Sequence, residues 1–175
     1  PDAPAGVNLF AYSMFSSVEV FISDQKVNPG TSFYPWMCYV LNLLYQSPET
    51  KKTSLKCAGW AADRPGYFDD IEPGKDHNDG YNERSDRTVY SMPVAYYFRV
   101  MLDTTFPARV LPVQTEMTLR FNRSDPSLCT MGKVLCRIRV VSAKLYVMKY
   151  RLTEQALQRH QQILSSEGVT FPMVK

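Results

Sequence analysis

The chain has 175 residues, of which 45% are hydrophobic and 13% aromatic, and its 20 Lys and Arg against 17 Asp and Glu give a net charge of +3. This composition is typical of a globular domain and excludes a disordered, collagen-like or histone-like chain. No apolar run reaches the roughly 18 to 20 residues that a membrane-spanning helix needs, so no membrane span is predicted. The chain opens at Pro1 rather than at Met, and we expect it to be a piece of a longer protein.

The first part of the sequence predicts a helical turn, a strand and a tight turn. Asn8–Phe15 has the spacing of a short amphipathic helical turn. Over Ser17–Ile22 the period changes to two, with Val18 and Val20 on the same face, which is typical of a half-buried strand. The polar residues Ser23–Gln25 then predict a turn.

A strongly apolar helix is predicted next. Thr31 or Ser32 could cap it, Pro35 would lie in its first turn, and Ser47–Pro48 would end it. Residues Trp36–Tyr45 leave almost no polar face, and a helix that is apolar all round is normally buried on several sides. We therefore expect other elements to cover this helix.

The segment Gly59–Ser91 differs from the rest of the chain in charge and pattern. Between Trp60 and Tyr90 eight acidic residues stand against four basic ones, a local charge of −4 that leaves +7 for the remainder. Prolines and glycines break the segment and no helical or strand period survives in it, so we predict a long surface loop. Because loops of this length are uncommon unless they have a function, we assign recognition or assembly to its acidic residues. These are Asp63, Asp69, Asp70, Glu72, Asp76, Asp79, Glu83 and Asp86.

The run Asp76–Gly80 resembles part of a calcium-binding loop, because oxygen ligands cluster near a glycine. With Gly80 at the sixth position of such a loop, Lys75 would be the first ligand and Asp86 the last. A carboxylate and a bidentate Glu are required at those positions. A solvated acidic loop is therefore favoured over a calcium site.

Three further strands are predicted. Val94–Asp103 is apolar on both faces, as in a strand covered on both sides, and we interpret Tyr96–Phe98 as core rather than as a platform for stacking bases. Val113–Asn122 alternates cleanly and predicts one solvated face. Val134–Leu152 alternates in two registers, and the phase slip in its middle predicts a bulge or a change of sheet.

A final helix is predicted from Thr153 to a terminating Gly168, with Glu154 in its first turn. Its inner stripe would consist of Ala156, Leu157, His160, Ile163 and Leu164. Together the elements predict a mainly β protein, an antiparallel jelly-roll β-sandwich with inserted helices and a long loop.

No catalytic or metal-binding motif stands out. The histidines, His77 and His160, are far apart in sequence, and there is no nucleophile elbow, phosphate-binding glycine loop or C-x-x-C pair. We interpret His160 as a partly buried packing residue. We therefore predict no enzyme, no cofactor and no metal. The cysteines are too few and too widely spaced for a disulfide-stapled scaffold, so thiols in a reducing compartment are expected at Cys38, Cys57, Cys129 and Cys136.

Two blocks near the start of the chain carry a family pattern. Residues 8–22 read N-L-F-A-Y-S-M-F-S-S-V-E-V-F-I, and residues 33–44 read F-Y-P-W-M-C-Y-V-L-N-L-L. They resemble the hexon-like double jelly-roll major capsid proteins of Polinton (Maverick) elements and related DNA viruses. Ala11 and Trp36 depart from the His and Tyr common at those positions of the family, and the acidic loop does not align with it.

Later blocks continue this resemblance in the family's order, at residues 49–55, 118–124 and 141–150, in the helix to His160 and at Phe171–Met173. The residues that match the family's core motifs are Phe15, Val18, Val20, Tyr34, Pro35, Leu44, Leu119, Leu145 and Val147.

The resemblance implies a structural capsid protein with two jelly rolls, whose homotrimers form the pseudo-hexameric capsomers of an icosahedral shell. Residues 1–152 would form the first jelly roll without its initial strands, with the acidic loop 59–92 as an insertion. Residues 153–175 would form a connecting helix and the start of a link to a second jelly roll. The expected location is the virion, after assembly inside the host cell.

The resemblance also implies partners, namely neighbouring capsomers and minor, penton-like capsid proteins. The basic residues are scattered, so a dedicated nucleic-acid surface is not predicted. Basic segments such as Lys133–Arg139 would contact packaged DNA nonspecifically through its phosphates. The alternative function is a non-enzymatic β-sandwich binding module that recognises protein or carbohydrate through the acidic loop.

Overall fold

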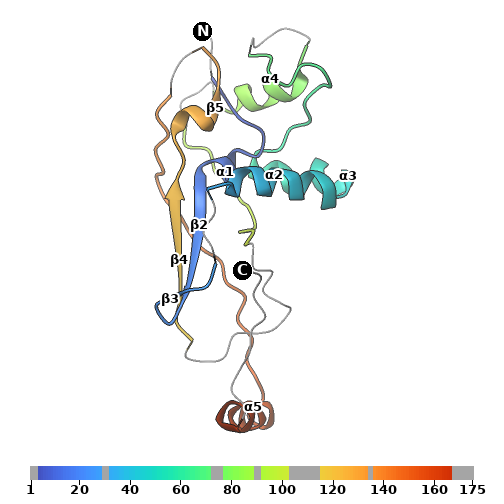
Figure 1. Ribbon diagram of the computed structural model, residues 1–175. Helices are drawn as coiled ribbons and strands as arrows, with labels where there is room; N and C mark the ends of the chain where they lie inside the picture. The colour runs from blue at the N-terminus through green and yellow to red at the C-terminus, as the bar shows by residue number, and fades with distance from the viewer. Residues whose placement is uncertain are drawn as a thin grey trace.

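The computed structural model describes residues 4–28, 32–71, 77–88, 92–102, 115–133 and 136–166. Its body combines two small antiparallel sheets with a group of short helices, while helix α5 (Glu154–Ser166) stands apart at the end of an extended segment (Figure 1). The predicted antiparallel strands with inserted helices are confirmed. Helix outweighs strand among the described residues and their strands close no barrel, so the mainly β jelly roll stays a prediction.

The larger sheet has the strand order β3-β2-β4 and joins segments that are far apart in sequence. β2 (Phe15–Ile22) pairs antiparallel with β4 (Met117–Arg123), and Val20 lies opposite Leu119. Val18 and Val20 are buried, whereas alternate residues of β4 are exposed. The period-two pattern therefore predicted both strands and their inward faces correctly where they are described, although β4 begins at Met117 and the first predicted residues, 113–114, lie outside the described structure.

The outward face of this sheet is polar and cross-linked by charges. The carboxylate of Glu19 on β2 lies 2.5 Å from the Lys26 ammonium on β3 (Gln25–Lys26) and 3.6 Å from the Arg120 guanidinium on β4. The hydrogen bond from Lys26 holds the pKa of Glu19 below its ordinary value. This is the solvated face that the alternation of β4 predicts.

β2 and β3 form a tight hairpin at the predicted turn. Ser23 and Asp24 both have positive φ, 47° and 65°, and Ile22 pairs with Gln25, which is a two-residue turn of the type I′ class. Past the end of β3, the Asn28 side chain continues the pairing. Its Oδ1 accepts a hydrogen bond from the Val20 amide at 2.7 Å and its Nδ2 donates to the Val18 carbonyl at 2.6 Å.

Helices α1 (Phe10–Ser13) and α2 (Tyr34–Tyr45) pack against β2 on the inward side of the sheet. The short helix α3 (Pro48–Lys52) follows α2 and packs against the 3-10 helix η1 (Ser54–Ala58), which in turn contacts α1. The helical turn, the apolar helix and its first-turn proline are confirmed. The predicted cap is wrong for Ser32, because α2 begins after Phe33 without a side-chain cap; Thr31 lies outside the described residues.

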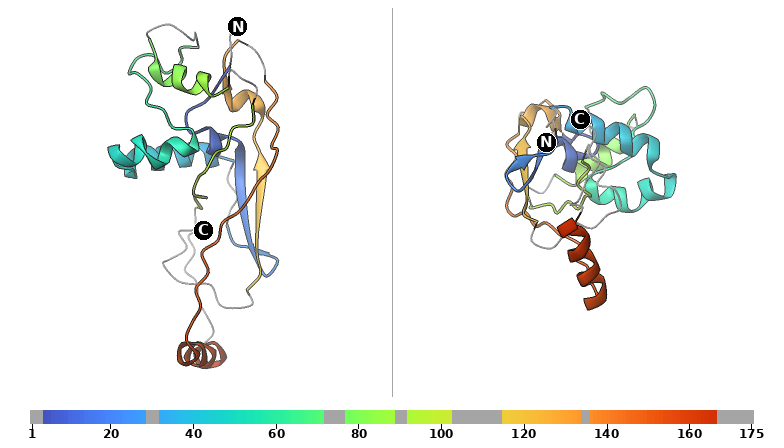
Figure 2. Two further views of the ribbon diagram at one scale, coloured as in Figure 1. Left: turned by 180° about the vertical axis from the view of Figure 1, so that it is seen from behind. Right: turned by 60° about the horizontal axis from the view of Figure 1, so that its bottom comes forward.

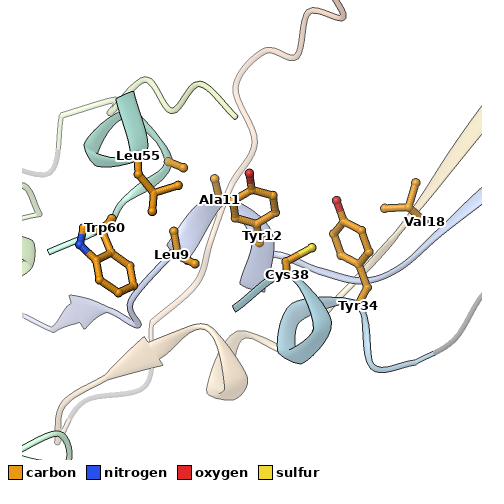
Figure 3. Close-up of a cluster of buried hydrophobic side chains, with 9 residues drawn as sticks. Leu9, Ala11, Tyr12, Val18, Tyr34, Cys38, Leu55 and Trp60 are labelled. Atoms are coloured by element: carbon orange, nitrogen blue, oxygen red, sulfur yellow. The ribbon is translucent and has the colours of Figure 1, made fainter. Parts of the chain in front are cut away.

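The core lies between the sheet and these helices (Figure 3). Tyr12 of α1 and Tyr34 of α2 lie with their ring centroids 6.5 Å apart beside the buried Cys38, and Trp60 packs at the far end with Leu55. The remaining buried members of the cluster are Leu9, Ala11, Val18 and Ala58.

The segment 92–102 crosses this core without pairing as a strand in the described structure, so the predicted strand at Val94–Asp103 is wrong there; Asp103 itself is not described. The predicted cover on both sides is wrong there as well, because Val94 is 40% and Tyr97 63% exposed, whereas Tyr96 and Phe98 pack against the core. Tyr96 packs on Phe10 with centroids 5.1 Å apart, and Phe98 packs on Tyr12 at 5.2 Å. These two rings are therefore core, as expected, although their backbone is irregular.

The two core tyrosines predict a loss of stability at high pH. Desolvation, with the Cys38 thiol nearby, raises the pKa of Tyr12 to about 12 and raises the pKa of Tyr34 further. An unfolded tyrosine titrates near pH 10. The contribution of the two neutral, buried tyrosines to the free energy of unfolding is therefore complete below about pH 10 and is lost as pH rises through their folded pKa values. We expect the free energy of unfolding to fall less steeply above pH 10 in Tyr34→Phe. Parallel curves for Tyr34→Phe and the parent would contradict this.

A second, smaller unit closes the upper end of the molecule in Figure 1. β1 (Ala5–Gly6) pairs with β5 (Thr130–Met131), which follows the short helix η2 (Pro126–Leu128), and α4 (Asp79–Asp86) packs against β1. This unit brings the start of the described chain, the acidic segment and residues beyond β4 together.

Candidate assembly surfaces

The acidic segment, residues 59–91, is not the unstructured loop that its sequence predicts. Residues 79–86 form helix α4, and the Asn78 side chain caps it by accepting hydrogen bonds from the amides of Gly80 and Tyr81 at 3.1 and 3.3 Å. The absence of an apolar period misled the prediction, because α4 buries Tyr81 and Ser85 together with a charged residue, Arg84.

The centre of the segment is a buried polar cluster built on Asp63 and Arg84. The Arg84 Nη1 lies 2.9 Å from Asp63 Oδ1, and their side chains are 3% and 8% exposed. Arg84 also donates through Nε to the Gly6 carbonyl at 2.9 Å. Asp63 accepts from the Asn8 amide at 2.9 Å and from the Asn78 amide at 3.0 Å. The cluster thus ties the acidic segment to the start of the chain.

The predicted acidic site residues therefore separate into distinct environments. Asp63 is internal, Asp70 lies 3.4 Å from His77 Nδ1, and Glu83 bonds Lys56 and Arg87 at 3.1 and 3.2 Å. Asp69, Asp79 and Asp86 are exposed, while Glu72 and Asp76 lie outside the described residues. The structure does not gather them into one site, and no group of metal-ligating side chains is present among the residues it describes.

The outer face of α2 is apolar and exposed. Trp36 and Leu44 are each 70% exposed and Tyr45 is 78% exposed, with Phe33, Val40 and Leu43 beside them. Only Tyr34, Cys38 and Asn42 of this helix are fully buried. The expectation of cover on several sides is therefore wrong within the described chain, and Leu44 is a surface residue here. Figure 1 shows α2 and α3 projecting away from the sheet.

A second exposed apolar surface runs along residues 136–152, which we call the C-terminal arm. The arm passes beside β4 and continues beyond the sheet to α5 (Figure 2). Arg123 Nη2 donates to the Ile138 carbonyl at 2.9 Å near its start. Every described residue from 139 to 152 is exposed, including Leu145 and Val147 at 56%. The strand predicted at Val134–Leu152 is therefore wrong over the described part of that range.

Helix α5 confirms the predicted final helix, but its inner stripe contacts nothing that buries it. No residue of α5 is buried, and Leu157, Ile163 and Leu164 are 37–46% exposed. His160 is exposed as well, so its interpretation as a packing residue is wrong. Gly168 lies outside the described residues.

The residues that match the core motifs of the capsid family fall into a buried or half-buried group and an exposed group. Val18, Val20 and Tyr34 are buried, and Phe15, Pro35 and Leu119 are half-buried. Leu44, Leu145 and Val147, which belong to α2 and to the arm, are exposed, so their placement in a core is wrong within the described chain. Their apolar character, together with the missing cover, makes both segments candidate contact surfaces.

Searches for similar proteins add no family to these observations: no family model, no curated protein and no solved structure matches the chain. The four cysteines are thiols, two of them buried, Cys38 and Cys129. None of the described helices combines the length and apolarity needed to cross a bilayer.

Proposed function

We propose that the chain is a structural subunit of a viral capsid, part of a hexon-like double jelly-roll major capsid protein that trimerises. The observation that carries the proposal is the exposure of apolar residues in two segments of the described chain, the outer face of α2 and the arm. Monomeric proteins seldom expose apolar surface of this kind without a partner. Both segments also belong to the blocks of sequence that resemble the capsid family.

The alternative, a binding module that uses the acidic segment, receives less support. Asp63 forms a buried ion pair with Arg84, and Glu83 forms ion pairs with both Lys56 and Arg87. The acidic residues that face solvent, such as Asp69 and Asp86, are spread over the surface of the segment. This segment is therefore better explained as the support of the polar cluster than as a recognition loop.

The proposal is tested on the full-length protein by native mass and negative-stain electron microscopy. We expect a homotrimer that assembles further into hexagonal arrays or shells. A protein that stays a stable monomer over the accessible concentration range would exclude the proposal.

Substitutions on the outer face of α2 should separate assembly from folding. Trp36→Glu and Leu44→Glu change highly exposed side chains, so we expect changes of at most about 0.5 kcal/mol in the free energy of unfolding. A charge buried in an apolar subunit contact is costly, and each variant should shift the native mass towards the monomer. Lys52→Glu, an exposed change on α3, is the matched control and should assemble normally.

A further inference from the structure

The arm has the side-chain pattern of a strand. In an extended chain alternate residues lie on opposite sides. The side formed by odd-numbered residues has two cations, four apolar side chains and two more cations in order: Arg137, Arg139, Val141, Ala143, Leu145, Val147, Lys149 and Arg151. The other side is mostly apolar, with Tyr146 79% exposed and Met148 77% exposed. Neither side is covered by the described parts of the chain.

Apart from the Ile138 carbonyl, which accepts a hydrogen bond from Arg123, the backbone of the arm is open to pairing among the described residues. No backbone-to-backbone hydrogen bond joins residues 137–151 to another described residue, although the arm is extended and passes the open edge of β4 (Figures 1 and 2). An extended segment with unpaired amides and carbonyls and alternating apolar side chains is a template for an added strand. Main-chain hydrogen bonds would supply part of the affinity, and the apolar side chains the rest.

Charge determines which strand fits. Between Asp125 and Glu154 the chain has six basic residues and no acidic one. Two arms paired antiparallel about Lys144 would place Arg137 opposite Arg151 and Arg139 opposite Lys149, and parallel pairing would place each cation beside its own copy. Like charges in opposite positions are unfavourable. A second copy of the arm is therefore a poor partner.

The open edge of β4 in another copy is also a poor partner, because β4 carries Arg120 and Arg123. A nucleic acid would satisfy the cations but would leave Val141, Leu145 and Val147 in water. Only a polypeptide strand that is apolar in its centre and acidic at both ends meets all three features of the arm, its unpaired backbone, its apolar centre and its cationic ends.

We propose that residues 137–151 bind an extended segment of a different protein by strand addition, and that this segment carries carboxylates on both sides of an apolar centre. The inference goes beyond the capsid proposal, because it concerns peptide binding by the subunit whether or not the subunit assembles.

The test uses the full-length protein and synthetic peptides of the arm's length, measured by fluorescence anisotropy at physiological salt. The probe peptide alternates Val and Thr and has two Glu at each end of its Val face. We expect saturable binding and slower hydrogen exchange of the amides of residues 137–151. A peptide with Lys in place of Glu should bind at least about tenfold more weakly, since each cross-strand pair changes from attraction to repulsion.

Two further comparisons separate strand addition from general attraction of anions. A probe peptide N-methylated along one edge keeps its charge but cannot pair, and it should lose binding. The double variant Arg137→Glu/Arg139→Glu should bind the Glu peptide at least about tenfold more weakly and the Lys peptide more tightly than the parent does. Lys52→Glu should change neither affinity. Ala143→Pro, in the middle of the arm, should abolish binding with an unchanged melting temperature, because proline removes an amide donor.

The proposal is overturned if the methylated peptide binds as well as the probe and single-stranded DNA displaces both, which would make the arm a polyanion surface. Arm amides that are already protected in the full-length protein alone would overturn it as well. Normal trimer assembly by the Arg137→Glu/Arg139→Glu variant would leave the capsid proposal intact, so the two hypotheses fail separately.

Discussion

Replacing Arg84 by Leu is expected to lower the free energy of unfolding by about 3–5 kcal/mol, the usual cost of removing one partner of a buried ion pair. The substitution leaves the Asp63 carboxylate, 8% exposed, without its guanidinium. It also removes the donor to the Gly6 carbonyl. Because α4, the start of the chain and residues 61–63 meet at this side chain, the loss should appear in a single cooperative urea transition.

Arg87→Leu, at the C-cap of the same helix, is the matched control. Arg87 is 29% exposed and pairs with Glu83 at 3.2 Å, an i,i+4 contact that contributes at most about 1 kcal/mol. Asp63→Leu combined with Arg84→Leu should cost less than the sum of the single changes, since neither charge is then left alone. Equal losses in Arg84→Leu and Arg87→Leu would show that the buried cluster does not hold this unit together.

Gly80→Ala is expected to destabilise the protein by about 1–3 kcal/mol, the usual cost of forcing an extra carbon into a packed site. In an ordinary helix interior the same change stabilises by about 1 kcal/mol. Here a Cβ would stand 2.5 Å from the Ala62 carbonyl oxygen and 2.8 Å from its carbon. Both are backbone atoms, so α4 must move away from residues 62–63 and strain the contacts between Asn78 and Asp63.

Gly66→Ala provides the contrast, measured in the same urea experiment. No atom lies within 4 Å of the Cβ position at Gly66, but its φ is +86°, so the cost should be about 1–2 kcal/mol from backbone strain alone. The circular dichroism of α4 should weaken only in Gly80→Ala. A Gly80→Ala protein that is more stable than its parent would contradict the packing of α4 on residue 62.

The sequence predicted the elements whose signal is local. Each of β2 and β4 has one face that is more buried than the other, so the alternation of its side chains is visible in the sequence. Ser23–Asp24 supplies the turn that the hairpin requires. The strands predicted at residues 94–103 and 134–152 failed for another reason. Alternation reports how side chains are disposed, whereas a ladder needs a partner strand, and the described structure supplies no such strand to either segment.

The candidate site was less predictable than the fold. Eight acidic residues indicated a solvated loop, because charge within one segment does not reveal which carboxylate meets a buried arginine. No sequence pattern indicated that Asp63 is contacted by both Arg84 and Asn8, because these two residues lie more than 70 positions apart. Asn78 did carry one, since an Asn followed by Asp79 is a common helix start, and this signal would have revealed α4.

The pairing of β2 with β4 has a consequence for how the protein folds. The Asn122 side chain bonds Ser17 across 105 residues of chain, whereas β2 and β3 are joined by two. The β2–β3 hairpin can form early. The pairing of β2 with β4 forms later, because closing a loop of this length costs more conformational entropy. During synthesis the edge of β2 that later pairs with β4 therefore stays open until the chain beyond residue 117 has left the ribosome, and this interval is when chaperone binding or aggregation should compete with folding.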